Sequence, residues 1–427
     1  MNIDPRGAGA SKVSRLSAPE FSARNVLALV FAGALIASCF KYTGLDVVGI
    51  DDSVYRTAVR EWWRGGNPYA TGLDANLAGT PFTYPPFALL LMSPLGWLGY
   101  VAVHNTMTLL TATGVAIMSF TVAHAIFRPV ETKGWWRWFA ACVLVAGALR
   151  SGNAVLSALS LGQVSIIVMA LCLTDVVLLR HTRAFGVLIA IAAAVKVTPA
   201  LFIVFLFAFD RRAGTRALVC ATLFTLLPVL VLPSATWRYF TDYLWNTDRV
   251  GDAARNANVS MTGVMARSGV GPAGELWSWI TFSAFIIAVS FLAVRRVWNY
   301  DSGVWAASII GQVTCLVSPV TWSHHAAWFS LSGALLLVYG LLLRRGGWLV
   351  RVALAAVGAV IIYALYSWAL LWSLPGAPTT GVHGFAVQSV FFLVGFSGLV
   401  GLWTVAFSHS LQASQGLSVG LRRESRA

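Results

Sequence analysis

Two adjacent carboxylates, Asp51 and Asp52, directly follow the first long apolar run of a chain that has only 16 acidic residues among 427. An ionised acid held against a bilayer surface costs free energy, so an acid in such a position usually has a function. An ionised aspartate in this position is suited to accept a proton from a sugar hydroxyl during a transfer reaction. The alternative is that both acids cap a helix that begins near Ser53, because Asp favours N-cap and first-turn positions. We expect one acid to cap this helix and the other to face a cleft.

A lysine, Lys196, lies inside an apolar run close to a helix-breaking proline, Pro199. An ammonium group is costly there unless it has an anionic partner. Either a lipid phosphate or an internal acid such as Asp51 would serve as that partner. The competing interpretation is a lysine that snorkels to the interface or satisfies the free carbonyls of a broken helix. The position favours a functional role for Lys196.

Histidines and aromatic residues are densest in the segment Pro319-Val-Thr-Trp-Ser-His-His325, which is followed by Trp328. His324 or His325 is able to pair with a phosphate or with a charge that develops during a reaction. The alternative is interfacial, because aromatic-rich helix ends anchor membrane proteins in the headgroup region. The motif alone leaves both interpretations open.

Five weaker candidates are side chains that could bind a sugar or a phosphate, most of them in other connecting segments. Asn153 and Gln163 bracket a short segment and carry amides that bond sugar hydroxyls, although loop amides usually meet water. Arg249 and Asn258 belong to a loop of mixed charge, residues 237–267, that suits either a phosphorylated headgroup or simple solvation. Trp322 is a candidate for stacking against a sugar face, with an aromatic membrane belt as the alternative.

The composition indicates which elements must position these side chains. The chain is 58% hydrophobic and 11% charged, with a mean hydropathy of +0.73, which predicts a polytopic, all-α membrane protein. Its net charge of +14 comes from short basic clusters between apolar runs, so we interpret these as topology signals and expect no nucleic-acid partner. The five cysteines lie in apolar runs without CxxC spacing, and no metal site is expected.

The topology follows from assigning the basic connectors to the cytoplasm. These are residues 128–137, 180–183, 211–216, 295–296, 344–351 and 422–423. The opposite, external side then receives residues 42–82, 151–163, 234–275, 318–325 and 373–384. We expect roughly ten to twelve transmembrane or re-entrant helices, with the active-site loops external.

Two stretches do not fit a single regular span. Residues 83–99 contain three prolines and are expected to lie in or dip into the interface. Residues 184–209 are expected to form two half-helices that meet at 196–199. The predicted domains are a cytoplasmic tail (1–24), one transmembrane domain (25–407) that begins with a retained signal anchor, and a second cytoplasmic tail (408–427).

Several short motifs, taken together and in order, resemble the polytopic glycosyltransferases of family 87. The matching motifs are Asp51-x-x-Val54-Tyr55, Phe82-Thr-Tyr-Pro-Pro-Phe87, Gly162-Gln163, Lys196-Val-Thr-Pro199, Thr247-Asp-Arg-Val-Gly251 and Ser318-Pro-Val-Thr-Trp-Ser-His-His325. The family's α-(1→2)-mannosyltransferases carry the last pattern, whereas its arabinofuranosyltransferases generally do not, so mannose is favoured. Ser165 departs from the Asn expected after Gly-Gln, and Ala326 and Ala327 replace a bulkier residue.

The resemblance implies a fold of the GT-C type and a function. An inverting enzyme would transfer mannose from polyprenyl-phosphate mannose to a lipid-anchored glycolipid acceptor, such as a phosphatidylinositol mannoside or lipomannan, without a cofactor or metal. It would be a multi-pass protein of the plasma membrane, among membrane lipids, with its active site on the external (periplasmic) side.

The same resemblance, together with the candidates described above, gives each site residue an expected role. Asp51 is the expected base, and Asp52 falls on a position that is usually apolar in the family. The expected catalytic residues are Asp51, His324 and His325; those for the donor phosphate are Lys196, Arg249 and His325. Those for the acceptor or sugar are Asp52, Tyr55, Tyr84, Asn153, Gln163, Asn258 and Trp322.

Three alternatives remain open at this point. One is an arabinofuranosyltransferase that uses polyprenol-phosphate arabinose on the same fold. Another is a flippase for a lipid-linked saccharide, suggested by the broken helix and the many spans. A catalytically silent scaffold is the third, against which the intact motifs argue. No P-loop, HExxH or GxSxG motif supports nucleotide-driven transport or common hydrolase chemistry.

Overall fold

The computed structural model describes residues 23–70, 80–127, 135–246, 249–255, 257–299, 303–342, 347–373 and 381–407. Most of the chain in these ranges is helical, and the described part contains no β-strand. The predicted all-α class is therefore confirmed. The two predicted tails lie outside the described residues, except for positions 23 and 24.

Long apolar helices account for most of the chain. Among the described residues, six helices are long and apolar enough to cross a membrane: α1 (Ala23–Thr43), α4 (Tyr100–Ile126), α10 (Arg211–Leu226), α13 (Gly271–Asn299), α16 (Trp348–Ser373) and α17 (Gly381–Phe407). A further candidate span is the pair α5 (Trp135–Ser151) and α6 (Asn153–Leu161), which is bent by 61°. The chain is a multi-pass membrane protein.

Shorter apolar helices form the centre of the bundle. These are α7 (Ser165–Leu178), α9 (Ala200–Phe209), α14 (Gly303–Val317) and α15 (Ala327–Leu342). Helix α14 is buried along nearly its whole length, whereas α10 and α16 expose apolar side chains on their outer faces. A helix that is apolar all round is stable only inside a core or against lipid, and this bundle uses both arrangements.

Both predicted interruptions are present. Helix α8 (Val187–Val195) ends at Lys196, whose backbone is extended, and α9 starts again after Pro199. The proline-rich stretch 83–99 forms only the short helix α3 (Pro86–Leu91) and the 3-10 helix η2 (Ser93–Trp97). Proline removes a backbone donor and clashes with the preceding turn, so neither stretch continues as one straight helix.

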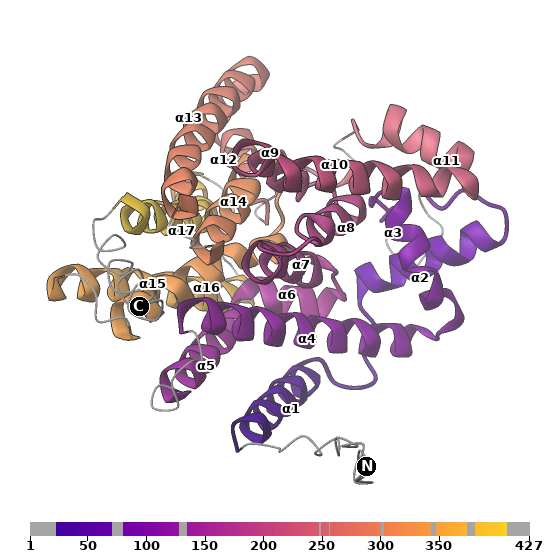
Figure 1. The fold of residues 1–427 in the computed structure, drawn as a ribbon. Helices are drawn as coiled ribbons and strands as arrows, with labels where there is room; N and C mark the ends of the chain where they lie inside the picture. The colour runs from indigo at the N-terminus through magenta and orange to yellow at the C-terminus, as the bar shows by residue number, and fades with distance from the viewer. Residues whose placement is uncertain are drawn as a thin grey trace, which may run out of the picture.

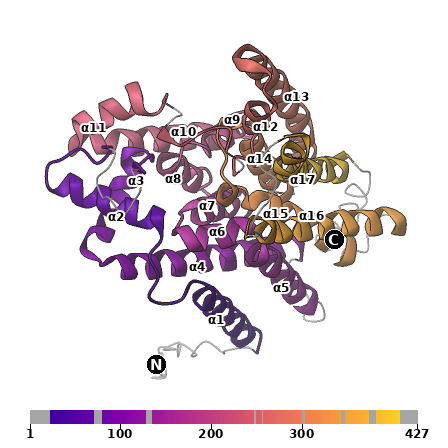
Figure 2. The same ribbon diagram turned by 180° about the vertical axis from the view of Figure 1, so that it is seen from behind.

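Three short helices lie together at one end of the molecule. Figures 1 and 2 view opposite sides, and both show α2 (Ile50–Trp63), α3 and α11 (Pro233–Arg238) together at the same end. Helix α2 packs against α4 and η2. The expected loop 237–267 contains the π-helical turn η4 (Tyr239–Tyr243) and most of α12 (Met261–Ser268). These elements, together with the α6–α7 turn and the α8–α9 break, position the site.

Candidate active site

Helix α2 carries both aspartates in its first turn. The helix begins at Ile50 with Gly49 at the N-cap position, and no side chain caps it. The predictions of a start near Ser53 and of a capping role for one acid are therefore wrong. Neither carboxylate caps the helix, because each is hydrogen-bonded to a side chain from another part of the chain.

Asp52 is fully buried and faces the inside of the bundle. Its Oδ2 lies 2.6 Å from Nδ1 of His104, a buried residue of α4. The neighbouring Gly162 has φ +73°, and a Cβ there would collide with the Asp52 carboxylate. Asp52 thus holds α2, α4 and the α6–α7 turn together, and it does not line the cavity, contrary to its predicted contact with the acceptor.

His104 was missed by the sequence reasoning. It is a single histidine in a long apolar run, and nothing in the sequence indicates which acid it meets. The only signal in the sequence was that a histidine in an apolar run is expected to be buried, and a buried imidazole needs a polar partner.

Asp51 points the other way, into a large cavity. Its Oδ2 accepts a hydrogen bond of 2.5 Å from Nε2 of Gln163. Burial raises the pKa of Asp51 to about 6, while the Gln163 amide and the positive charge of Lys196 act to lower it. Because a general base works best when its pKa lies near the operating pH, this environment suits a base.

Gln163 lies at the turn between α6 and α7 and is 4% exposed. Its Oε1 accepts hydrogen bonds from the hydroxyls of Tyr84 at 2.7 Å, Tyr55 at 3.2 Å and Ser165 at 3.3 Å. Sequence reasoning missed Ser165 as a site residue, although its departure from the family pattern had marked it. The hydroxyls of Tyr55 and Tyr84 are therefore engaged with Gln163.

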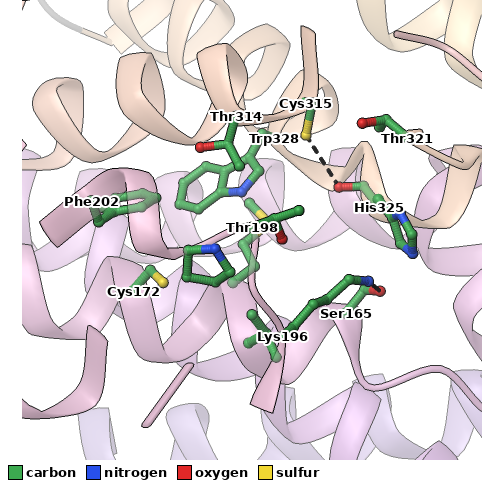
Figure 3. A pocket seen from close by; sticks show the side chains of 13 residues that line it. Ser165, Cys172, Lys196, Thr198, Phe202, Thr314, Cys315, Thr321, His325 and Trp328 are labelled. Carbon is green, nitrogen blue, oxygen red and sulfur yellow. Dashed lines mark hydrogen bonds between the residues drawn. The ribbon is translucent and has the colours of Figure 1, made fainter. Parts of the chain in front are cut away.

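Lys196 lies at the α8–α9 break and lines the same cavity. Its Nζ donates to Ser165 Oγ at 3.1 Å and lies 5.5 Å from the centre of the Tyr84 ring. Figure 3 shows its side chain extended alongside Ser165, across a small pocket from Cys315. Within the described residues Lys196 forms no ion pair, so its ammonium group is available to an anion.

The cavity has a volume of about 870 Å³. Nine of the predicted site residues line it: Asp51, Tyr55, Tyr84, Gln163, Lys196, Arg249, Trp322, His324 and His325. A smaller pocket of about 40 Å³ adjoins it and shares Lys196, Thr198, Thr314 and His325 with it. A volume of this kind accommodates a small ligand together with part of a second one.

The two histidines lie in the 3-10 helix η6 (Ser323–His325), with ring centroids 4.4 Å apart in an edge-to-face arrangement. Burial and the nearby Lys196 charge lower the pKa of His324 to about 3 and that of His325 well below its usual value. Nε2 of His324 is buried and has no hydrogen-bond partner among the described residues. Both rings are therefore neutral at pH 7, so each can offer an N–H donor to a phosphate but no positive charge.

Arg249 lines the cavity and also ties two loops together. Its Nη2 donates to the carbonyl of Tyr69 at 2.6 Å, and its guanidinium stacks on Tyr243 at 4.3 Å. Arg255, another residue of this mixed-charge loop, is an exposed cation on the lining of the same cavity. Positions 247, 248 and 256 of this loop lie outside the described residues.

The two remaining predicted amides do not line the cavity. Asn258 is fully buried; its Oδ1 accepts from the backbone N–H of Thr321 at 3.0 Å, and its Nδ2 donates to the Ala253 carbonyl at 3.0 Å. It fixes the loop against residues 319–322, which corrects its predicted contact with sugar. Asn153 starts α6, half-buried and outside the cavity.

Comparison with known proteins decides the family. The sequence profile of glycosyltransferase family 87 matches residues 82–319, more than half of the chain. This chain belongs to glycosyltransferase family 87. The family match includes Gln163, Lys196 and Arg249, whereas Asp51 precedes the matched range and the histidine pair follows it.

Two curated relatives of this family 87 glycosyltransferase each cover about three quarters of its length. It is 30% identical over 342 residues to the polyprenol-phosphate-mannose-dependent α-(1→2)-phosphatidylinositol mannoside mannosyltransferase of Mycobacterium tuberculosis, covering 76% of this chain and 77% of the relative. The protein of the same name from Mycolicibacterium smegmatis is 30% identical over 341 residues, covering 76% of each chain. A crystal structure of ArnT from Cupriavidus metallidurans bound to undecaprenyl phosphate aligns over 89% of this chain and 77% of its own, with 15% identity and a TM-score of 0.37.

Proposed function

We propose that this family 87 enzyme transfers mannose from polyprenyl-phosphate mannose to a lipid-anchored mannoside on the external face of the plasma membrane. The observation that carries the proposal is that Asp51 and Lys196 face one cavity. A base and a cation there match the two charges that change during glycosyl transfer from a lipid phosphate.

Asp51 serves the acceptor end of the reaction. It takes the proton of the acceptor hydroxyl while the oxygen forms a bond to the anomeric carbon of mannose. The bond from that carbon to the phosphate oxygen breaks, and polyprenyl phosphate leaves with the electron pair. Displacement on a β-linked donor inverts the anomeric carbon and gives an α link.

Lys196 serves the leaving-group end. Its ammonium group stabilises the charge that develops on the phosphate, and the neutral rings of His324 and His325 add N–H donors. Arg249 and Arg255 lie on the loop of the same cavity and attract anionic lipid headgroups.

The identity of the sugar and of the link rests on the relatives. Both named relatives depend on polyprenol-phosphate mannose and act on phosphatidylinositol mannoside with α-(1→2) specificity. We therefore assign mannose as the transferred sugar, an α-(1→2) link as the product, and a phosphatidylinositol mannoside or lipomannan-like acceptor.

The test is transfer by the purified protein in lipid vesicles. Radiolabelled polyprenyl-phosphate mannose and a phosphatidylinositol mannoside should give a labelled glycolipid that an α-(1→2)-mannosidase cleaves. Transfer from polyprenyl-phosphate arabinose instead of the mannose donor, or movement of the donor across the bilayer without transfer, would overturn the proposal.

The side of the membrane is tested separately. Trp245→Cys places a thiol on an exposed residue of the cavity lining, and Thr182→Cys places one in a connector assigned to the cytoplasm. A membrane-impermeant thiol reagent should label the first in intact cells and the second only after permeabilisation. The reverse pattern contradicts the external assignment.

A further inference from the structure

The amide of Gln163 is almost completely enclosed by hydrogen-bonding groups. Its nitrogen donates to Asp51, and its oxygen accepts from three hydroxyl groups. The residue is 4% exposed. An amide whose oxygen already has three donors has little capacity left for a sugar hydroxyl.

The orientation of this amide is determined by the chemistry of its neighbours. An ionised carboxylate only accepts hydrogen bonds, so the NH₂ group must face Asp51. The oxygen then faces Tyr55, Tyr84 and Ser165, each of which has a hydroxyl proton to donate. The reversed amide would place its oxygen against the carboxylate and its N–H groups against the three hydroxyls, at the cost of the 2.5 Å bond to Asp51.

This orientation distinguishes the two oxygens of the base. Oδ2 of Asp51 is occupied by an N–H donor, and an amide nitrogen does not accept a proton in return. We propose that Gln163 is a positioning residue that reserves Oδ2 of Asp51 and so directs the acceptor's proton to Oδ1. The inference rests on the proposed function, because it requires Asp51 to act as the base.

In the resulting step the acceptor O–H bond breaks and its proton goes to Oδ1. The acceptor oxygen forms its bond to the anomeric carbon, and the bond from that carbon to the phosphate oxygen breaks. Ser165 connects this arrangement to the phosphate end, since its hydroxyl donates to Gln163 and accepts from Lys196. Gln163 therefore acts on the reaction through Asp51 and not through the sugar.

Gln163→Glu tests the proposal through the pH dependence of kcat/KM for mannose transfer. A second carboxyl beside Asp51 raises the pKa of the pair because like charges disfavour ionisation. We expect the acidic limb of the profile to move to higher pH, with kcat reduced about 10²-fold for loss of the aligned base and the acceptor KM changed little. An unmoved limb with a raised acceptor KM would mean that Gln163 binds sugar, and would overturn the proposal.

Ser160→Glu is the matched control. Ser160 is exposed on the same end of α6 and outside the cavity, with its hydroxyl near Tyr42. The carboxylate that this substitution introduces should leave the acidic limb of the pH profile in place. If this control moves the limb as far as Gln163→Glu does, the effect is one of general charge, and the proposal fails.

Tyr84→Phe gives a second test that keeps the ring and most of the packing. It removes the shortest of the three bonds to Gln163 Oε1, so kcat should fall severalfold at unchanged acceptor KM. A raised acceptor KM at unchanged kcat would overturn the inference, including in the case where Gln163→Glu does not fold. Wild-type protein without mannose transfer would instead overturn the proposed function, which separates the two failures.

Discussion

Asp51 and Asp52 are neighbours in the chain but lie in opposite environments. Asp51 is half-buried, faces the cavity and is bonded to an amide; Asp52 is fully buried and bonded to His104 of another helix. Successive side chains on a helix point about 100° apart, so a helix that starts at Ile50 directs the two acids to different surroundings. A shift of one residue along this helix therefore separates a chemical role from a structural one.

The largest expected effect is on the cavity side. Asp51→Asn keeps the shape of the side chain but removes the proton acceptor, so mannose transfer should fall about 10²–10⁴-fold. The measurement is the initial rate of labelled glycolipid formation at matched protein concentration. A rate within twofold of wild type would remove Asp51 from the chemistry.

A second effect should distinguish the cation from the base. Lys196→Met removes the charge that acts on the donor phosphate, and kcat should fall about 10²–10³-fold. Because the Lys196 charge also lowers the pKa of Asp51, the acidic limb of the remaining activity should move to higher pH. Lys196→Arg, which retains the charge, is the control; a limb that stays in place in Lys196→Met contradicts the coupling.

On the buried side the expected effect is on stability. His104→Leu leaves the Asp52 carboxylate buried without its partner, which should destabilise the fold by about 3 kcal/mol. Thermal unfolding in lipid vesicles or detergent measures this change. Transfer per folded molecule should stay within severalfold of wild type, and a specific loss of turnover in fully folded protein would mean that the pair takes part in catalysis.

The smallest effect is a pH dependence of the unmodified enzyme. The pKa of Asp51 is raised to about 6, so the base is protonated and inactive below that pH and ionised above it. The profile of kcat/KM should therefore show an acidic limb near pH 6. A limb near pH 4, the ordinary range of an aspartate, would show that burial does not act on this group.

Much of the fold was predictable because it depends on local chemistry. The apolar runs form the helices, and the interruptions occur at Pro199 and at the prolines of the stretch 83–99. The start of α2 was missed by three residues, because Gly49 takes the N-cap position and the aspartates follow it inside the helix. At this helix the preference of Asp for the N-cap position is overridden by hydrogen bonds to residues that are distant in the sequence.

The site was predictable only as a set of residues that belong together. Nine predicted residues line one cavity, but their bonds join positions far apart, such as Asp51 and Gln163, which are 112 residues apart. Which atoms meet depends on helix phase and packing, and these are not local properties. The amide of Asn258 illustrates the limit, since most of its partners are backbone groups that any sequence supplies, such as those of Ala253 and Thr321.

The most direct test compares Asp51→Asn with Asp52→Asn at pH 7.5 in rate of mannose transfer and in unfolding temperature. An Asp51 pKa raised from 3.8 to about 6 means that its ionisation weakens the fold as pH rises through 6, so Asp51→Asn should unfold at a higher temperature while losing transfer. Asp52→Asn should unfold at a lower temperature and retain transfer per folded molecule. Transfer retained by Asp51→Asn and lost by fully folded Asp52→Asn would contradict the assignment of the two acids.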